Sequence, residues 1–210
     1  MFKKYSLISI LLVFAISYSG CTSTASLLKT QTTNVYVDKV DTKVALYIHP
    51  DFYDRVFTAK SNSHCWLWKA EVSMSNAYVS AIQSGIESAF KDVVLLKTIP
   101  TPDYMNSNNI KLAIVANLSN EGGDVTYEDG FFSGDLKSNF QTSINLSFSD
   151  KNGRAFYTFT ANGASFNSLS GSCGDMADCL KKSMEIALRQ ASDYIAQSCY
   201  SASQIRDAIK

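Results

Sequence analysis

The chain has 210 residues, of which 46% are hydrophobic and 12% aromatic, and its 19 basic residues balance its 19 acidic ones. This length and apolar content allow a sizeable core and exclude a disordered, collagen-like or small disulfide-knot protein. The balanced charge provides no surplus of Lys and Arg for phosphate contacts, so we expect no nucleic-acid partner. One domain is the default expectation at this length.

The N-terminal segment has the pattern of an export signal. Two lysines precede an apolar run over 7–16, which small residues follow. The run is too short for a permanent membrane-spanning helix, and the pattern predicts a cleaved signal peptide over 1–20. Ser19-Gly20-Cys21 resembles the lipobox of bacterial lipoproteins, which implies a lipid anchor on Cys21. The alternative is an ordinary secretory signal that leaves Cys21 as a thiol.

The segment after Cys21 is rich in Ser and Thr. Residues 22–34 contain no aromatic residue and a single Lys. This composition predicts a lipidated Cys21 with a flexible tether over 21–34, leaving 35–210 as a single α+β periplasmic domain. In the lipoproteins that the lipobox resembles, a residue other than Asp after the cysteine favours the outer membrane, so Thr22 implies that membrane, with the domain facing the periplasm. Several acyl chains together would anchor it stably.

Four cysteines remain, an even number in a compartment that oxidises thiols: Cys65, Cys173, Cys179 and Cys199. Apolar residues at steps of three and four predict a helix from Asp175 to about Ser198, which separates Cys179 and Cys199 by about 30 Å. Bridged cysteines need Cα atoms within about 7 Å. We therefore predict the bridges Cys173–Cys179 and Cys65–Cys199. A metal site is the alternative, but the chain lacks paired CxxC motifs and spaced histidines, so no metal or other cofactor is expected.

The first half of the domain is predicted as a strand, a loop, a helix and a short strand. Lys43–His49 alternates and ends at Pro50, and Val93–Ile99 is apolar and β-branched. Between them, Ser75 is predicted to cap a helix that reaches Phe90. The loop predicted over Asp51–Glu71 holds five aromatic residues: Phe52, Tyr53, Phe57, Trp66 and Trp68.

The second half changes to a period of two. Alternating residues predict strands at 110–118, 140–148 and 157–161, and Asp150–Gly153 predicts a tight hairpin turn between the last two. Glu121–Asp124 and Asp129–Gly130 are predicted as further turns, with an open sheet edge near Phe131 and Phe132. The terminal helix follows. This order predicts an α+β fold, a two-layer sandwich in which two amphipathic helices cover one face of an antiparallel sheet of about four to five strands.

Element order also gives a family resemblance. It is carried by the helix Ala77–Phe90, the strands Asn109–Val115 and Gln141–Leu146, the turn Asp150–Gly153 and the terminal helix. In this pattern the run over 80–193 resembles the YajG-type group of small bacterial lipoproteins and, more loosely, the LptE type that assists outer-membrane assembly. The resemblance covers a little over half of the chain and implies an outer-membrane lipoprotein with no established activity to transfer.

Catalytic motifs are missing from the sequence: it contains no GxSxG, HExxH, Walker or strand-linked GxGxxG pattern. The two histidines, His49 and His64, have no partner motif, and Glu128 with Asp129 precedes a glycine as turn residues do. The segment Gly171–Asp175 before the last helix admits two interpretations, an anion site or a cap by Asp175, of which we favour the cap. We therefore predict that the protein is not an enzyme.

The aromatic residues of the predicted loop have two possible roles. They form either an exposed patch for a protein or lipid partner, or a seal over the open end of the sandwich under the Cys65–Cys199 bridge, and we favour the seal. The predicted function is a non-catalytic scaffold or assembly partner of an envelope complex, with homo-oligomers possible through an open edge. The alternative is a module that binds a lipid or small amphiphile in the periplasm.

Overall fold

The computed structural model describes residues 21–30, 32–33, 38–61, 64–128 and 134–210; the signal peptide predicted over 1–20 and Phe131 and Phe132 lie outside these ranges. Eight strands, four α-helices and two short 3-10 helices follow one another in the described residues. In chain order they are β1 Cys21–Ser26, β2 Val40–Ile48, η1 Pro50–Phe52, β3 Arg55–Lys60, β4 Trp68–Ser75, α2 Ala77–Ala89, β5 Phe90–Leu96, α3 Pro102–Ser107, β6 Leu112–Glu128, β7 Gly134–Asp150, β8 Ala155–Gly171, η2 Cys173–Asp175, α4 Met176–Ser201 and α5 Ser203–Ala208.

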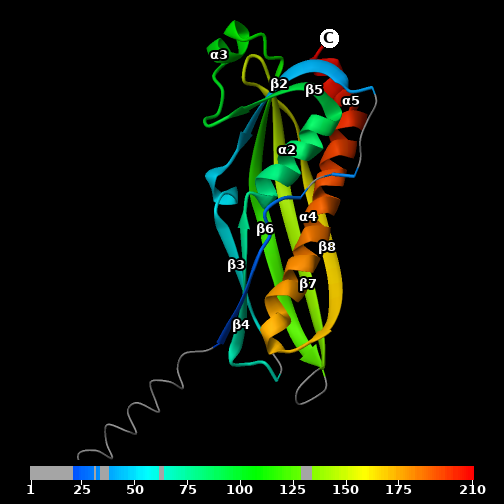
Figure 1. The fold of residues 1–210 in the computed structure, drawn as a ribbon. Coiled ribbons are helices and arrows are strands. Elements are labelled where there is room, and N and C mark those ends of the chain that lie inside the picture. Colours follow the sequence, from blue (N-terminus) through cyan, green and yellow to red (C-terminus); the bar gives the residue numbers. More distant parts are fainter. Residues whose placement is uncertain (1–20, 31, 34–37, 62–63, 129–133) are drawn as a thin grey trace, which may run out of the picture.

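The strands form two sheets (Figure 1). The larger has the order β5-β2-β6-β7-β8 and the smaller has the order β1-β4-β3. The α+β class and the five-stranded sheet confirm the prediction, but the sheet is mixed rather than antiparallel. β2 pairs in parallel with both β5 and β6, while β6, β7 and β8 are antiparallel. These strands are parallel because the segments with helices α2 and α3 return the chain to the end of the sheet at which β2 begins, before β5 and β6 start.

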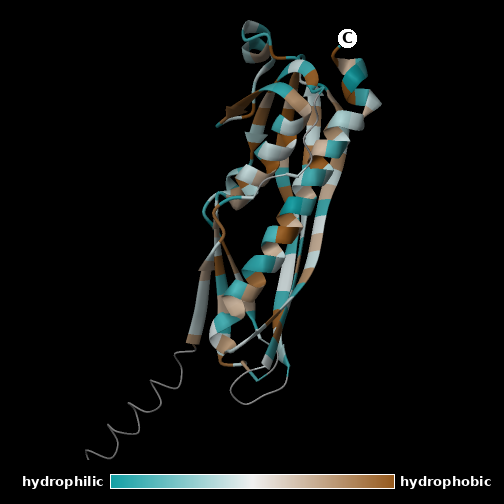
Figure 2. Cartoon of the chain, turned by 45° about the vertical axis from the view of Figure 1, so that its right-hand side comes forward, coloured by the Kyte–Doolittle hydropathy of each residue, from teal (hydrophilic) through white to brown (hydrophobic). Residues whose placement is uncertain are grey.

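The core lies between the helices and the inner faces of the two sheets. On β7 every second residue from Leu136 to Phe148 is buried, which is the period-two pattern of the sequence. α4 presents one buried stripe to this face, formed by Leu180, Met184, Ala187, Leu188, Ala191 and Ile195. In Figure 2 the exposed side of α4 is hydrophilic, as an amphipathic helix requires. The two predicted helices therefore share one face of the large sheet.

A third helix, absent from the sequence prediction, covers part of the opposite face. Met105 of α3 packs with Ile110, Ala45 and Ala113 in a small separate cluster. Thr101 accepts a hydrogen bond from the backbone N–H of Tyr104, and Pro102 opens the helix, so a cap and a helix-initiating proline define its start. The short apolar segment around Met105 gave too little periodicity to predict it.

Strand β6 is longer than predicted. The glycines at 122 and 123, expected to form a turn, instead lie inside β6, which pairs with β7 from Leu112 to Glu128 around an irregularity at Leu118/Asn120. A Cβ on Gly123 would lie 2.6 Å from the carbonyl oxygen of Asn139. The glycine therefore allows a close strand approach rather than a turn. The predicted hairpin turn at Asp150–Gly153 is confirmed, with Gly153 at a φ of +80°.

The helix α2 begins and ends slightly differently from the prediction. Asn76, not Ser75, occupies its N-cap position, and Phe90 is the first residue of β5. Gly85 of α2 faces α4, where an added Cβ would meet the carbonyl oxygen of Ser192 at 2.7 Å. The Ser192 hydroxyl donates to the carbonyl oxygen of Ala81 at 2.6 Å. Small residues therefore bring the two helices together.

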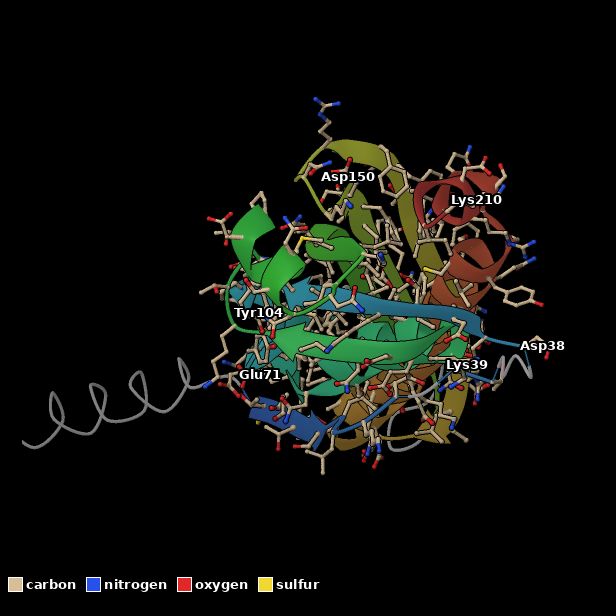
Figure 3. All side chains as sticks on the ribbon, turned by 90° about the horizontal axis from the view of Figure 1, so that it is seen from above. Asp38, Lys39, Glu71, Tyr104, Asp150 and Lys210 are labelled. Atoms are coloured by element: carbon tan, nitrogen blue, oxygen red, sulfur yellow. A yellow bond between two sulfur atoms is a disulfide. The ribbon has the colours of Figure 1, made fainter. Side chains whose placement is uncertain are left out.

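The molecule is elongated, with different features at its two ends (Figure 1). β1 and β4 begin at one end, where α4 also starts, and α3, α5 and the C-terminus lie at the other end, which we call the distal end. Viewed from the distal end, Tyr104 of α3, Asp150 of the β7–β8 turn and Lys210 lie around the periphery (Figure 3). The end that carries Cys21 thus lies opposite the C-terminus.

Candidate functional site

Cys21 is exposed and is the first residue of β1. β1 pairs in parallel with β4, and the register places Cys21 beside Trp68, the first residue of β4. Part of the segment predicted as a flexible tether over 21–34 is therefore a strand, which is a correction. A Ser/Thr-rich composition suits a linker, but β-branched Thr also suits an edge strand once a partner strand is present.

Several described residues of the predicted tether also form hydrogen bonds with the domain. The Ser23 hydroxyl donates to the carbonyl oxygen of Gly174 and accepts from the backbone N–H of Ala177 at 3.1 Å, so it caps the start of α4. The backbone N–H of Thr30 donates to the Ser80 hydroxyl at 2.9 Å. Thr33 donates to the Asp193 carboxylate through its hydroxyl at 2.8 Å and through its backbone N–H. Cys21 therefore lies at the start of a strand that is hydrogen-bonded to the domain, without a flexible linker between them.

A disulfide lies at the same end. It joins Cys65 to Cys173, with Cα atoms 5.6 Å apart. The predicted pairings Cys173–Cys179 and Cys65–Cys199 are therefore wrong. Cys65 begins the turn that leads into β4, at the end where α4 starts. Cys199 is near the far end of this 26-residue helix, about 35 Å away along its axis. The helix does keep Cys179 and Cys199 apart, as the sequence argument required.

The other two cysteines are free and fully buried. The Cys179 thiol lies 3.3 Å from the Ser138 hydroxyl and 3.5 Å from the carbonyl oxygen of Leu136. Burial raises the pKa of the Cys199 thiol well above its ordinary value. A thiol that stays protonated and shielded is a poor nucleophile, so Cys199 is a core residue.

The predicted aromatic loop is not an open loop, because β3 and the first half of β4 lie within 51–71 and form a β-hairpin. Phe52 is buried against Tyr78, with ring centroids 5.2 Å apart, and Phe57 packs edge-on to Phe140 at the same distance. Trp68 is partly buried against the core. These three aromatics are core residues, though not under the predicted bridge. The alternation of Ala70, Val72 and Met74 was the signal for β4 that the sequence prediction missed.

The two remaining aromatics of this set are exposed. Tyr53 is 40% exposed and Trp66 is 71% exposed. Trp66 and Leu67, which is 49% exposed, are the central residues of a turn closed by a 2.7 Å hydrogen bond from the backbone N–H of Trp68 to the carbonyl oxygen of Cys65. We call residues 65–68 the Trp66–Leu67 turn. It lies next to Cys21, because Trp68 is the register partner of Cys21.

The residues before α4 form a cap. Asp175 accepts from the backbone N–H of Ser172 at 2.8 Å and from its hydroxyl at 2.9 Å, and the backbone hydrogen bond is the main reason why the pKa of this carboxyl is lowered. The carboxylate thus closes the 3-10 turn η2, while Ser23 caps α4 itself. Asp175 therefore holds the N-cap position of α4 without a side-chain capping hydrogen bond to that helix, so the predicted cap of α4 is corrected: its carboxylate acts in the capping box of η2 instead.

The two histidines and Glu128 lie at or near the surface, and Asp129 lies outside the described residues. His49 Nδ1 lies 3.2 Å from the Asp51 carboxylate at the surface, and Glu128 forms an exposed ion pair with Lys137. His64 is exposed. Within the described ranges, no group of three or more His, Cys, Asp or Glu side chains is placed to hold a metal ion.

One buried polar network connects the two sheets and α2. The Glu121 carboxylate, with its side chain 6% exposed, accepts from Arg55 Nε at 2.8 Å and Nη2 at 2.6 Å, and from the Tyr78 hydroxyl at 2.8 Å. The Thr142 hydroxyl lies 2.8 Å from Tyr78. Burial raises the pKa of Tyr78 far above its ordinary value, and the negative charge of Glu121 adds to this effect. A phenol held neutral in this way stabilises the fold and cannot act as a base.

This network predicts a specific alkaline response. Because the folded-state pKa of Tyr78 is raised, its contribution is present below the unfolded pKa of about 10 and is lost as pH rises above it. Near neutral pH, Y78F should lower the free energy of unfolding by about 1–2 kcal/mol. Above pH 10 the difference between wild type and Y78F should shrink by about 1.4 kcal/mol per pH unit. Urea titrations at several pH values measure this, and a pH-independent difference would contradict it.

A shallow depression of about 400 Å³ lies on the outer face of the small sheet. Its lining is mainly small or polar: Thr24, Ala25, Ser26, Val56, Glu71 and Ser73. The depression is too open to the solvent to enclose an acyl chain. In the described part of the chain, no helix combines the length and apolar character needed to cross a membrane.

Comparisons with known proteins give only distant structural likeness. No protein-family model and no curated protein matches the chain, so the YajG-type resemblance stays a prediction. A neuraminyllactose-binding hemagglutinin homolog from Helicobacter pylori is 11% identical with a TM-score of 0.38, covering 85% of this chain and 95% of that one. A minor lipoprotein from Acinetobacter baumannii is 10% identical with a TM-score of 0.39, covering 78% and 94%. The PelC dodecamer from Paraburkholderia phytofirmans is 14% identical with a TM-score of 0.25, covering 75% and 94%. At these scores the likeness carries no inference about ligands or partners.

Proposed function

We propose that this chain is a bacterial lipoprotein of the outer membrane, held by acyl chains on Cys21, with its domain facing the periplasm. The observation that carries the proposal is the position of Cys21: it follows a lipobox-like sequence and is exposed at one end of an elongated domain. An anchor there leaves the distal end pointing away from the membrane. The Cys65–Cys173 bridge fits an oxidising compartment.

Within the envelope, we propose a non-catalytic role as a scaffold or assembly partner. Its support is the set of exposed apolar residues near the distal end, where Leu95 is 42%, Ile99 60% and Tyr104 40% exposed. Tyr104 lies at the periphery of that end (Figure 3). Aromatic and apolar residues of this kind commonly contact protein partners. Binding of a small amphiphile is the less favoured role, because the depression on the small sheet is open and mostly polar.

Two experiments in bacteria that express the full chain test the two halves of the proposal. Wild type should fractionate with the outer membrane, and Cys21→Ala with residues 1–20 replaced by an ordinary secretory signal should move to the soluble periplasmic fraction, because it lacks the acylated thiol. Retention of Cys21→Ala at the membrane would contradict anchoring. A photo-crosslinking residue at position 99 should capture an envelope protein, whereas the same residue at exposed position 58 of β3 is the matched control. Equal capture at both positions would contradict a partner surface at the distal end.

A further inference from the structure

The anchor and the Trp66–Leu67 turn occur at the same end of the molecule. β1 and β4 are parallel and start together, at Cys21 and Trp68. The turn residues precede Trp68, so they lie on the side from which β1 also enters the sheet. Paired strands are about 4.8 Å apart and consecutive Cα atoms about 3.8 Å, so the Cα atoms of Cys21 and Trp66 are at most about 12 Å apart.

The turn is held rigidly in this position. Its first residue, Cys65, is fully buried and bonded to Cys173, and its last residue, Trp68, belongs to β4. The hydrogen bond between the backbone groups of Trp68 and Cys65 closes the turn. Trp66 and Leu67 are therefore exposed on a turn that the disulfide holds in place, although burial of their apolar surface would be favourable. Such an exposed apolar pair requires an explanation other than folding.

We propose that the Trp66–Leu67 turn inserts into the interfacial region of the bilayer that holds Cys21. This inference rests on the proposed anchoring. Because 21–26 is a strand and Ser23 is tied to Gly174 and Ala177, the acylated cysteine has no long tether and the turn must lie at the membrane surface. Tryptophan is the side chain most suited to that region, where its ring meets acyl chains and its indole N–H meets headgroups. A lipid surface, rather than a protein, is the occupant that the anchor itself places there.

Electrostatics have a minor part in this contact. Lys60 and Lys69 are register partners at this end, but Lys69 is paired with Glu71 at 2.7 Å. Asp178 of α4 is exposed nearby in the first turn of the helix. The positive and negative charges are therefore mixed, and we expect the depth of Trp66 to change little between low and high salt.

The test uses the acylated chain in vesicles of phosphatidylethanolamine and phosphatidylglycerol. The chain has two tryptophans, so W68F leaves Trp66 as the sole tryptophan and W66F leaves Trp68, and excitation at the red edge of tryptophan absorption avoids the tyrosines. Lipids brominated near the headgroup end of their acyl chains should quench W68F about twofold or more relative to W66F, with a blue shift against the detergent-free Cys21→Ala form of the same variant. Emission from Trp66 that stays solvent-like in vesicle-bound protein would overturn the inference.

Further measurements distinguish a failure of the anchoring from a failure of the insertion. Absence of acyl chains on Cys21, or failure of the protein to float with vesicles, would refute the anchoring, whereas floating protein with an unquenched Trp66 would refute the insertion alone. If W68F does not fold, 5-fluorotryptophan labelling of the unsubstituted chain gives separate signals for both side chains, and spin-labelled lipid should broaden the Trp66 signal more strongly. A photo-crosslinker at position 66 that captures protein instead of lipid in cells would also overturn the proposal.

Discussion

Replacing Cys65 and Cys173 together by serine is expected to lower the free energy of unfolding by about 4 kcal/mol. The bridge spans 108 residues of sequence, and a cross-link over so long a segment strongly restricts the unfolded chain. In the folded state it also joins the β3–β4 connection to the start of α4. Urea denaturation of the Cys21→Ala background, with and without the two further substitutions, measures the loss.

A matched control separates the bridge from ordinary loss of buried sulfur. Cys199→Ala removes a buried thiol without a bridge, so it should cost about 1–2 kcal/mol, and reducing agent should not change its effect. Reducing agent should instead convert wild type to the stability of the double serine variant. A stability unaffected by reduction, or an unreduced peptide that links Cys65 to Cys199, would contradict the pairing.

Gly163→Ala is expected to destabilise the protein by about 3 kcal/mol or more. A Cβ at this position of β8 would lie 1.9 Å from the carbonyl oxygen of Ala187, and the opposing atom belongs to the backbone of α4. A flexible side chain could turn away, but a helix backbone cannot move without disturbing the core stripe that includes Leu188. β8 and α4 would therefore have to separate.

Strand β6, separated from β8 by β7 in the same sheet, offers the control. A Cβ on Gly122 would meet only the Gln141 side chain, at 3.5 Å, so Gly122→Ala should change the free energy of unfolding by no more than about 0.5 kcal/mol. Thermal and urea unfolding of the two variants side by side give the comparison. Equal stabilities would show that β8 and α4 are not packed as closely as the structure has them.

The parts of the fold that sequence predicted best are those with local periodicity. The alternation on β7, the long apolar stripe of α4 and the Asp150–Gly153 turn each contain their own signal within a few residues. The glycines of β6 led to a wrong prediction of a turn, because glycine suits both a turn and a close approach of two strands. The second role becomes visible only in the structure, where the carbonyl oxygen of Asn139 lies against Gly123.

The candidate site was harder to predict because it is made of distant segments. Cys21 was singled out from its local sequence. Its strand, however, exists only through pairing with β4, and its register partner Trp68 is distant from it along the chain. A correct prediction of the disulfide likewise required knowledge of strand pairing between distant segments. Without β3 and β4, Cys65 seemed to belong to an open loop, whereas the hairpin places it beside Cys173. Long-range pairing of this kind has no local signature.

The central claim is that Cys21 carries the lipid that holds this domain at the membrane. Mass spectrometry of the mature protein purified from bacterial membranes tests it directly. We predict an N-terminal Cys21 whose sulfur bears a diacylglyceryl group and whose amine is acylated, with a mass higher than that of the bare 21–210 chain by those groups. A mature chain with an unmodified Cys21, or one that begins at another residue, would contradict the claim.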